Sequence, residues 1–316
     1  MKSSGDVLLL DAVHPLLTDA LAEMGYRCLH EPAISRDELR ERIPSLTGII
    51  VRSKLKLDRD LLEHGHGLRF IGRVGSGLES IDVDYARSRG IACLNSPEGN
   101  RQAVGEHAAG MLLALANKIC VANSEVRQGI WKREENRGFE LAGKTIGIIG
   151  YGNTGSAFAA CISGFGTHVL AYDKYKEGFG NGQVKEARMD EIFDEADVLS
   201  LHVPLTQETT YLVNSEYLGR FRKKIILINT ARGPVVNTSD LVNALRAGAI
   251  LGAGLDVLEY EHLSFEKLEM DALPADFRTL ASLPNVVLTP HVAGWTVESK
   301  EKLAKVLADK IRQVTP

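Results

Sequence analysis

The stretch "TIGIIGYGNTGSAFAA", residues 145–160, places three glycines between two different patterns. Its first five residues form an apolar run typical of a buried strand, and small residues compatible with a helix follow the last glycine. Gly150, Gly152 and Gly155 have the spacing G-x-G-x-x-G. After a strand, the first glycine suits a tight turn, the second lets a pyrophosphate approach backbone N–H groups, and the third lets helix and strand pack closely. The stretch therefore predicts a dinucleotide-binding turn in an α/β domain.

An acidic residue lies where such a site uses one. The next apolar run, 168–172, ends at Asp173, roughly 20 residues beyond the last glycine. A carboxylate there accepts hydrogen bonds from a ribose hydroxyl and repels a 2′-phosphate, which favours NAD over NADP. Lys174 and Lys176 weaken that preference, because a cation offsets the repulsion. The alternative, a tight turn without a ligand, is less favoured because strand, glycines, helix and acid occur in order.

Composition limits the partners. The chain has 316 residues, is 44% hydrophobic and carries a formal net charge of −4. This length favours two domains, and the charge gives no overall attraction to nucleic acid or to an anionic membrane. The first apolar run, Val7 to Leu10, is too short for a signal peptide, and no long uncharged apolar stretch follows. We expect a cytoplasmic protein that acts on a small molecule, with an acidic metabolite still compatible.

The cysteines and histidines give no metal-site pattern. Cys28, Cys93, Cys120 and Cys161 lie far apart without a CxxC pair, so we expect buried free thiols and no disulfide. The segment "EHGHG", residues 63–67, offers two histidines and one carboxylate, but a solvent-exposed turn explains it better than a metal site. No metal is predicted.

Two blocks of alternating strands and helices occupy the chain, which predicts parallel sheets. Strands are expected at 6–10, 26–30, 47–51, 68–72 and 91–95, and then at 145–149, 168–172, 197–203, 224–230, 252–257 and 285–290. Ser35 and Glu38 form a capping box. Residues 100–128 predict one long connecting helix. After His291, Thr296 is expected to cap a final helix whose apolar stripe comprises Leu303, Val306, Leu307, Ile311 and Val314.

Polar residues follow the last strands of the second block. Arg232 follows 224–230, Asp256 and Glu261 follow the strand of "GAGLDVLEYE", and His291 ends the strand of "NVVLTPHVAGW". Reduction of a 2-keto acid needs a proton donor, a cation for the carboxylate and a hydride; histidine and arginine supply the first two. A carboxylate beside the imidazole stabilises its charged form. Each residue alone has an ordinary explanation: a surface histidine, a loop ion pair, or a solvated acidic face.

Five ordered segments, "GIIGYGNTG", "LHVPLT", "INTARGPVV", "GAGLDVLEYE" and "TPHVAGW", together resemble the D-isomer-specific 2-hydroxyacid dehydrogenase family, and most of all its D-3-phosphoglycerate dehydrogenases. The resemblance implies a flavodoxin-like substrate-binding domain, 1–97 plus 293–316, and a Rossmann NAD-binding domain, 98–292, with the active-site cleft between them. It also implies a homodimer through the NAD domain, with the long helix and residues 119–142 as contacts.

The resemblance assigns roles residue by residue. Arg232 corresponds to the substrate-orienting arginine, His291 to the acid/base, Glu261 to its partner, and Asp256 to the residue that contacts the nicotinamide carboxamide. Val74, Gly75 and Ser76 correspond to the loop for the substrate carboxylate, with Arg52 and Ser53 nearby. Arg52, Arg73 and, less closely, Arg133 match cations for a substrate phosphate, although Arg73 and Arg133 also suit ion pairs at a boundary. The full set expected at the cofactor is Gly150, Tyr151, Gly152, Asn153, Thr154, Gly155, Asp173, His202, Val203, Pro204, Thr209, Thr230, Ala231, Asp256, His291 and Gly294.

Three departures from the family pattern bear on specificity. His262 stands where many members have proline, and residues 262–285 make a long path to His291. Trp295 replaces a small residue and is expected either to narrow the pocket or to stack on another element. Nothing follows Pro316, so the regulatory module of some relatives is expected to be absent.

The expected function is NAD-dependent interconversion of a D-2-hydroxy acid and its 2-keto acid. The leading pair is 3-phosphoglycerate and 3-phosphohydroxypyruvate, in serine biosynthesis. The alternatives are a glyoxylate or hydroxypyruvate reductase and, in another class, a dinucleotide-sensing corepressor-like binding protein.

Overall fold

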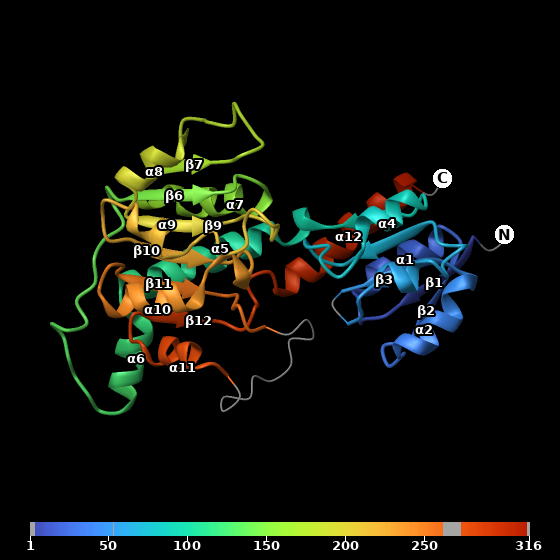
Figure 1. The fold of residues 1–316 in the computed structure, drawn as a ribbon, viewed down its shortest axis with the longest axis horizontal. Helices are drawn as coiled ribbons and strands as arrows, with labels where there is room; N and C mark the ends of the chain where they lie inside the picture. The colour runs from blue at the N-terminus through green and yellow to red at the C-terminus, as the bar shows by residue number, and fades with distance from the viewer. Residues whose placement is uncertain (1–3, 53, 262–272, 315–316) are drawn as a thin grey trace. The chain divides into compact units, whose positions relative to one another are not determined.

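The computed structural model describes residues 4–52, 54–261 and 273–314 (Figure 1). Contacts between Cα atoms divide the chain into two compact units. Unit 1 comprises 1–101 with 295–316, and unit 2 comprises 102–294. The corresponding boundaries expected from sequence were 97/98 and 292/293.

Unit 1 is built on a five-stranded parallel sheet, as predicted. Its strands are β1 (Gly5–Leu9), β2 (Tyr26–His30), β3 (Leu46–Val51), β4 (Phe70–Arg73) and β5 (Ala92–Asn95), in the order β2-β1-β3-β4-β5. This is the flavodoxin-like order, in which the direction of winding reverses between β1 and β3. The carboxyl ends of those two strands therefore form the switch point of unit 1, where ligands of such sheets bind.

Helices cover both faces of this sheet. The helices α1 (Pro15–Glu23) and α12 (Val297–Val314) share one core with β1 and β4, whereas α2 (Arg36–Arg42), α3 (Arg59–Leu62) and α4 (Val83–Ser88) cover the other face. In α12 the predicted stripe buries Leu303, Leu307 and Ile311, but Val314 is exposed because the helix ends there. Residues of β1 therefore pack against a helix from the far end of the chain.

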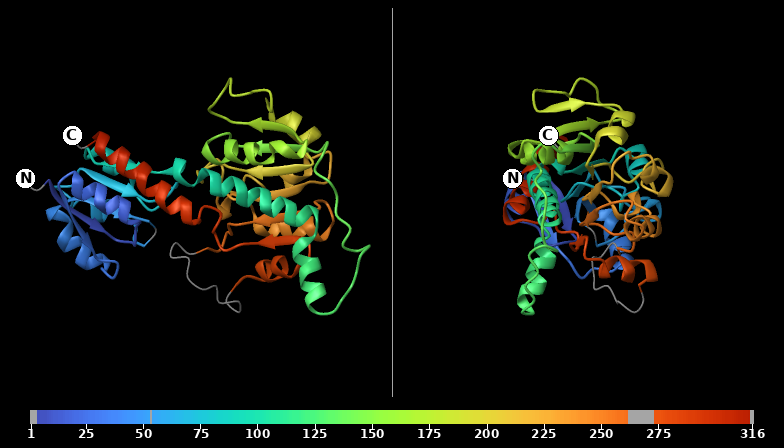
Figure 2. Two further views of the ribbon diagram at one scale, coloured as in Figure 1. Left: turned by 180° about the vertical axis from the view of Figure 1, so that it is seen from behind. Right: turned by 90° about the vertical axis from the view of Figure 1, so that its left-hand side faces the viewer.

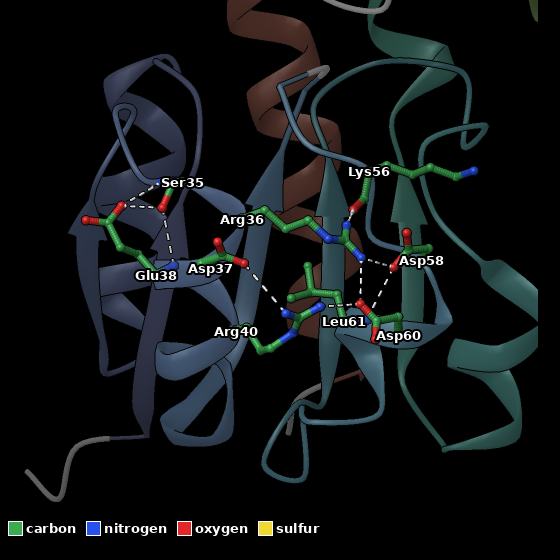
Figure 3. Close-up of polar contacts among 9 residues, drawn as sticks. All are labelled: Ser35, Arg36, Asp37, Glu38, Arg40, Lys56, Asp58, Asp60 and Leu61. Carbon is green, nitrogen blue, oxygen red and sulfur yellow. Dashed lines mark hydrogen bonds and ion pairs between the residues drawn. The ribbon is translucent and has the colours of Figure 1, made fainter.

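The predicted capping box is confirmed in the structure (Figure 3). The Ser35 hydroxyl accepts the Glu38 N–H at 3.3 Å, and the Glu38 carboxylate accepts the Ser35 N–H at 2.8 Å. On the same helix, Arg36 pairs with Asp58 at 2.5 Å and Asp60 at 3.0 Å, and donates to the Lys56 carbonyl at 3.1 Å. These contacts join α2 to the segment that enters α3 and stabilise that face of unit 1.

Unit 2 contains a seven-stranded parallel sheet. Its strands are β6 (Thr145–Ile149), β7 (His168–Tyr172), β8 (Val184–Glu186), β9 (Val198–Leu201), β10 (Ile226–Asn229), β11 (Gly252–Leu255) and β12 (Val286–Leu288), in the order β12-β11-β10-β9-β6-β7-β8. Read from β8, this is the Rossmann order with β12 added at the edge. The winding reverses between β6 and β9, and the glycine-rich turn follows β6. The sequence did not predict β8, a three-residue edge strand.

Two layers of helices cover this second sheet (Figures 1 and 2). α5 (Pro97–Ala116) and α7 (Asn153–Ile162) share a core on one face, and α8 (Met189–Glu195), α9 (Ser215–Gly219), α10 (Thr238–Arg246) and α11 (Ala275–Ser282) cover the other. Short 3₁₀ turns complete the chain: η1 (Ile43–Ser45), η2 (Ser163–Phe165) and η3 (Gly233–Val235).

The expectation of one long helix over 100–128 was wrong. The chain forms α5 and then α6 (Ile119–Arg127), with Lys118 between them in the left-handed conformation at φ 52°. A continuous helix would use the Ala116 carbonyl for the N–H of residue 120. Instead that carbonyl accepts the Phe139 N–H at 3.0 Å, so the returning segment ends α5.

The expectation of buried thiols was also inaccurate. Cys120 is exposed, because α6 buries none of its residues, and the other three cysteines are half-buried. Burial raises the pKa of the Cys28, Cys93 and Cys161 thiols. Within the described ranges, no three His, Cys, Asp or Glu side chains are grouped for a metal ion, and no helix is long and apolar enough to span a bilayer.

Candidate active site

His291 and Glu261 form a close pair in unit 2. The distance from His291 Nδ1 to Glu261 Oε2 is 2.6 Å, and both side chains are partly exposed. The other carboxylate oxygen of Glu261 accepts the Leu258 N–H. Because one oxygen is tied to backbone, the carboxylate is fixed in place to receive Nδ1–H and to orient the ring. The structure thus brings together two residues that the sequence placed 30 positions apart.

The backbone of His291 is held in an uncommon conformation. Its φ is 54°, in the left-handed region that few non-glycine residues adopt. The His291 N–H lies 2.8 Å from the Asp256 carbonyl oxygen and 3.1 Å from that of Thr289. Such conformations cost roughly 1–3 kcal/mol and persist only where surrounding structure enforces them. These two hydrogen bonds provide that enforcement and direct the imidazole.

Asp256 is the anchor of this segment. It is 1% exposed, and its Oδ1 accepts the Thr289 hydroxyl at 2.6 Å and the Val292 N–H at 2.9 Å. Its Oδ2 accepts the Ala293 N–H at 2.8 Å. Four acceptor positions are available on a carboxylate, so Oδ2 retains capacity for one further donor. The buried charge therefore organises the turn that carries His291.

His107, on α5, belongs to the same network and was missed by the sequence analysis. Its Nε2 lies 2.9 Å from the Thr289 hydroxyl and 3.5 Å from Asp256 Oδ1. Because the Thr289 hydroxyl donates to Asp256, it accepts from His107, which places a proton on Nε2. The sequence shows only that His107 lies among alanines in a predicted helix. This pattern does not predict which residue the imidazole contacts.

Arg232 lies at the carboxyl end of β10, on a loop fixed by a buried amide. Asn229 Oδ1 accepts the Ala231 N–H at 3.0 Å, and Asn229 Nδ2 donates to the Arg232 carbonyl at 3.0 Å. Gly233 is packed so closely that a Cβ there would lie 2.0 Å from the Leu258 carbonyl. The absence of a side chain lets the Arg232 loop contact the segment that leads to Glu261.

The three glycines after β6 meet different steric requirements. Gly150 has φ 90°, and a Cβ there would lie 2.6 Å from the His202 carbonyl oxygen. A Cβ at Gly155 would lie 2.0 Å from the Gly150 carbonyl oxygen, whereas nothing lies within 4 Å of one at Gly152. α7 begins here without a side-chain cap. Open space beside uncapped helix N–H groups fits the pyrophosphate of a dinucleotide.

The acid after β7 is fixed beside this turn. Asp173 Oδ2 accepts the Tyr151 N–H at 2.8 Å, and its Oδ1 accepts the Tyr175 N–H at 2.9 Å. Lys174 pairs with Glu208 at 2.6 Å, an interaction that raises the pKa of the lysine. Lys174 is therefore committed to a carboxylate other than Asp173, while Lys176 donates to the Tyr151 carbonyl at 3.2 Å.

Two other cofactor candidates carry unsatisfied buried atoms. Within the described residues, His202 Nδ1 and Thr230 Oγ1 have no hydrogen-bond partner. His202 Nε2 lies 2.8 Å from the Ser200 hydroxyl, and burial lowers the pKa of this imidazole to about 3. Thr209 donates to the Pro204 carbonyl at 2.7 Å. Five further cofactor candidates also lie in unit 2 and are partly or fully buried: Asn153, Thr154, Val203, Ala231 and Gly294.

The substrate candidates Arg52, Arg73, Val74, Gly75 and Ser76 lie in unit 1, at or just beyond the carboxyl ends of β3 and β4. Two of the three backbone amides expected to receive a carboxylate donate within the unit. The Val74 N–H bonds the Val51 carbonyl at 3.0 Å, and the Gly75 N–H bonds the Arg73 carbonyl at 2.9 Å. Ser53, and the first part of the long path at 262–285, fall outside the described residues; Arg133 is exposed in unit 2.

Comparisons with known proteins identify the family to which the chain belongs. The sequence model described as "D-isomer specific 2-hydroxyacid dehydrogenase, NAD binding domain" matches residues 109–293. A hydroxypyruvate reductase of Thermotoga maritima is 37% identical over 278 residues, which cover 88% of each chain. A D-3-phosphoglycerate dehydrogenase of Archaeoglobus fulgidus is 34% identical over 96% of this chain, which spans only 56% of that longer relative.

A solved structure gives the same result. The D-lactate dehydrogenase of Aquifex aeolicus, complexed with NAD and lactic acid, is similar with a TM-score of 0.83 and 29% identity. The match covers 97% of this chain and 94% of that one. The chain therefore belongs to the family of D-isomer-specific 2-hydroxyacid dehydrogenases, which are NAD-dependent oxidoreductases.

Proposed function

We propose that His291, Glu261 and Arg232 carry out the interconversion of a D-2-hydroxy acid and its 2-keto acid. The observation that carries this proposal is the 2.6 Å contact between His291 Nδ1 and Glu261 Oε2. With Nδ1–H directed to the carboxylate, Nε2 is the ring nitrogen that exchanges a proton with the substrate oxygen. Glu261 stabilises the imidazolium present before that proton is transferred.

Arg232 is proposed to orient the acid. Its guanidinium offers a planar fork that binds a carboxylate through two parallel hydrogen bonds, and its charge helps to polarise the neighbouring carbonyl. The Asn229-fixed loop limits the movement of the arginine backbone. This positioning contributes to catalysis because the substrate carbon is held in one orientation.

The residues around the glycine-rich turn fit the cofactor. The open Gly152 backbone and the uncapped start of α7 would hold the pyrophosphate, and Asp173 would accept the adenosine ribose hydroxyls. Oδ2 of Asp256 has capacity for a carboxamide donor. When bound, the reduced nicotinamide supplies the hydride for the carbonyl carbon.

The proposed substrate pair is 3-phosphoglycerate and 3-phosphohydroxypyruvate. The supporting observation is the proximity of two cationic residues in unit 1: Arg73 Nε donates to the Arg52 carbonyl at 3.1 Å, and burial together with the Arg73 charge lowers the pKa of Arg52. Adjacent guanidinium groups favour an acid that carries a second anionic group. Hydroxypyruvate is the second candidate, because the reductase of Thermotoga maritima matches this chain along nearly its whole length.

Oxidation of NADH, with NADPH in parallel, tests the proposal. The panel is 3-phosphohydroxypyruvate, hydroxypyruvate, glyoxylate and pyruvate, followed by loss of reduced-nicotinamide absorbance. We expect the highest kcat/KM for the phosphorylated acid with NADH. A preference for hydroxypyruvate would select the second candidate. NADH binding without turnover of any acid would contradict the catalytic proposal and favour a dinucleotide-sensing binding protein.

We also propose a homodimer through the NAD domain. α6 and the segment after it expose Ile119, Val126, Trp131 and Phe139, the tryptophan at 77%. Apolar side chains grouped on a helix that buries none of its own residues are typical of a protein interface. Analytical ultracentrifugation of the wild-type protein should show a dimer, and Trp131→Glu should raise its dissociation constant. A wild-type protein that is monomeric at micromolar concentration would contradict the proposal.

A further inference from the structure

Charged residues from three strand ends meet at the switch point of unit 1. Asp11 follows β1 and Arg52 follows β3, and the Arg52 N–H donates to Asp11 Oδ2 at 2.6 Å. Arg73, at the end of β4, donates to the Arg52 carbonyl at 3.1 Å. Three neighbouring strand ends therefore place two guanidinium groups at the position where flavodoxin-like sheets bind ligands.

Arg52 is half-buried, and among the described residues its side chain donates no hydrogen bond. Its backbone groups are both engaged. Burial lowers the pKa of Arg52 to about 10, with the Asp11 carboxylate opposing this shift and the Arg73 charge adding to it, so the group still carries its charge at neutral pH. A desolvated cation with open donors is costly unless a ligand or another group compensates it.

Trp295 supplies partial compensation. The Arg52 guanidinium carbon lies 3.2 Å from the centroid of the Trp295 ring, well within the range of a cation–π contact. A cation–π contact engages the guanidinium through its charge and not through its N–H donors. The tryptophan therefore restricts the orientation of Arg52 without occupying its donors.

Trp295 is itself held by the start of α12. The Ser299 N–H donates to the Thr296 hydroxyl at 3.1 Å, and the Thr296 N–H donates to the Ser299 hydroxyl at 2.9 Å. Sequence analysis predicted this cap at Thr296, and it fixes the residue just before it. Lys300, one turn into the helix, places its ammonium 4.6 Å from the same indole ring. Arg52 thus contacts the ring of a residue that directly precedes the hydrogen-bonded cap of α12.

We propose that Trp295 is a positioning and specificity residue: it holds Arg52 so that the guanidinium binds an anionic substituent of the substrate. This inference rests on the proposed function and deepens it. A phosphoryl group on carbon 3 is the ligand class that a guanidinium fork binds best. Glyoxylate has no such substituent and therefore does not use this contact.

The first experiment compares two substrates in the same enzyme. We measure the ratio of kcat/KM for 3-phosphohydroxypyruvate to that for glyoxylate in the full chain and its variants. Trp295→Leu is expected to lower this ratio about tenfold, through KM for the phosphorylated acid, in line with the loss of a partly desolvated cation–π contact. Trp295→Phe, which keeps an aromatic face, should recover most of the ratio. An unchanged ratio, or an equal fall for both acids, would overturn the inference.

Lys300→Met is the matched control. It removes the other cation from the same ring while keeping an apolar stem on the indole. Because Lys300 is exposed and has water available to it, the ratio should change less than twofold. A tenfold change of the kcat/KM ratio in this variant would show that any positive charge near Trp295 affects the ratio. It would contradict a specific role of the contact between Arg52 and Trp295.

A binding measurement separates this inference from the proposed reaction. The chain has two tryptophans, so Trp131→Phe leaves Trp295 as the sole fluorophore of its kind. Titration of that variant with 3-phosphoglycerate should change the tryptophan emission saturably, and adding Arg52→Met should abolish the change. If the enzyme turns over no keto acid but this response is present, the proposed reaction fails and the site stands. Absence of both the response and calorimetric binding would overturn the site.

Discussion

The turn that carries His291 and the switch point that carries Arg52 are held by different kinds of interaction. In unit 2, His291 is fixed by directional hydrogen bonds: two to its own N–H, one to its ring, and three on the buried Asp256 that organises the turn. In unit 1, Arg52 is positioned at its side chain by one stacking contact with Trp295. Hydrogen bonds specify direction steeply, whereas a ring face tolerates lateral displacement. Under the proposed function, this difference suits the first region to a fixed reaction and the second to adjustment of which acid is bound.

The largest effect should come from breaking the directional region at its centre. His291→Asn is expected to lower kcat by about 10³-fold, because the amide cannot exchange a proton near neutral pH. Asparagine tolerates left-handed φ, so the turn should be retained. Steady-state turnover measures the loss, and fluorescence titration should show NADH binding within about twofold of wild type. Retained turnover would remove His291 from the mechanism.

Arg232→Lys should have the next effect. An ammonium group keeps the charge but cannot reproduce the two parallel hydrogen bonds of the guanidinium, so kcat/KM should fall about 10²-fold. The matched control is Arg246→Lys, at an exposed position near the end of α10, which should leave kcat/KM unchanged. Equal activity of Arg232→Lys and wild type would show that the fork does not bind the carboxylate.

Asp256→Asn tests whether the turn depends on a buried charge. The amide group cannot accept the hydrogen bonds of both Val292 and Ala293, so one buried N–H loses its acceptor. We expect the free energy of unfolding to fall by about 2–3 kcal/mol, measured by urea denaturation. If the variant is as stable as wild type, the carboxylate does not anchor the segment.

His202 gives unit 2 a pH dependence. Its pKa is about 3 in the folded protein, below the ordinary value of 6.5, so between these values the unfolded state binds a proton that the folded state does not. Stability contributed by this group is present above pH 6.5 and is lost as pH falls, by at most about 1.4 kcal/mol per pH unit. His202→Gln removes this titration, so the difference in unfolding free energy between the two proteins should depend on pH below 6.5. A constant difference from pH 7 to pH 4.5 would contradict it.

The smallest expected effect is that of Trp295→Leu on the free energy of unfolding. Trp295 is 42% exposed, and Trp295→Leu should change the free energy of unfolding by less than about 1 kcal/mol. The measurement is again urea denaturation, alongside Asp256→Asn. A loss as large as that of Asp256→Asn would mean that the Arg52 stack is a structural contact, and the contrast between the two regions would disappear.

The features that could be predicted from the sequence are those that depend on steric contacts between residues close together in the chain. Contacts with neighbouring backbone require a glycine at Gly150 and Gly155, and Gly152 lies beside open space at the start of α7. The spacing of these glycines therefore predicted both the fold and the cofactor. The pairing of Glu261 with His291 also followed from motifs. His107 was missed because its partner Thr289 is distant in sequence and reached only through the packing of α5. The break at Lys118 was missed because the Ala116 carbonyl is taken by Phe139, a residue of the returning segment.

Unit 1 illustrates the same limit. The sequence allowed two interpretations of Trp295, narrowing of the pocket or stacking on another element. Its contact with Arg52 depends on tertiary packing. Similarly, the motif at Val74 and Gly75 suggested available amides, but both N–H groups donate to carbonyls at strand ends, Val74 to Val51 of β3 and Gly75 to Arg73 of β4. Pattern reasoning identifies residue types and spacing, whereas the choice of partner depends on elements that meet only after folding.

The packing of α12 in unit 1 has a consequence for synthesis. Leu303, Leu307 and Ile311 complete the core that also contains Val7 and Phe70. A ribosome produces those last residues only after the whole of unit 2. Until then this face of the unit 1 sheet is covered by α1 alone, whereas unit 2, which is continuous in the chain, already has all of its strands. The part of this face that α12 covers therefore stays open for most of translation, and unit 1 completes its core only after the last helix has been made.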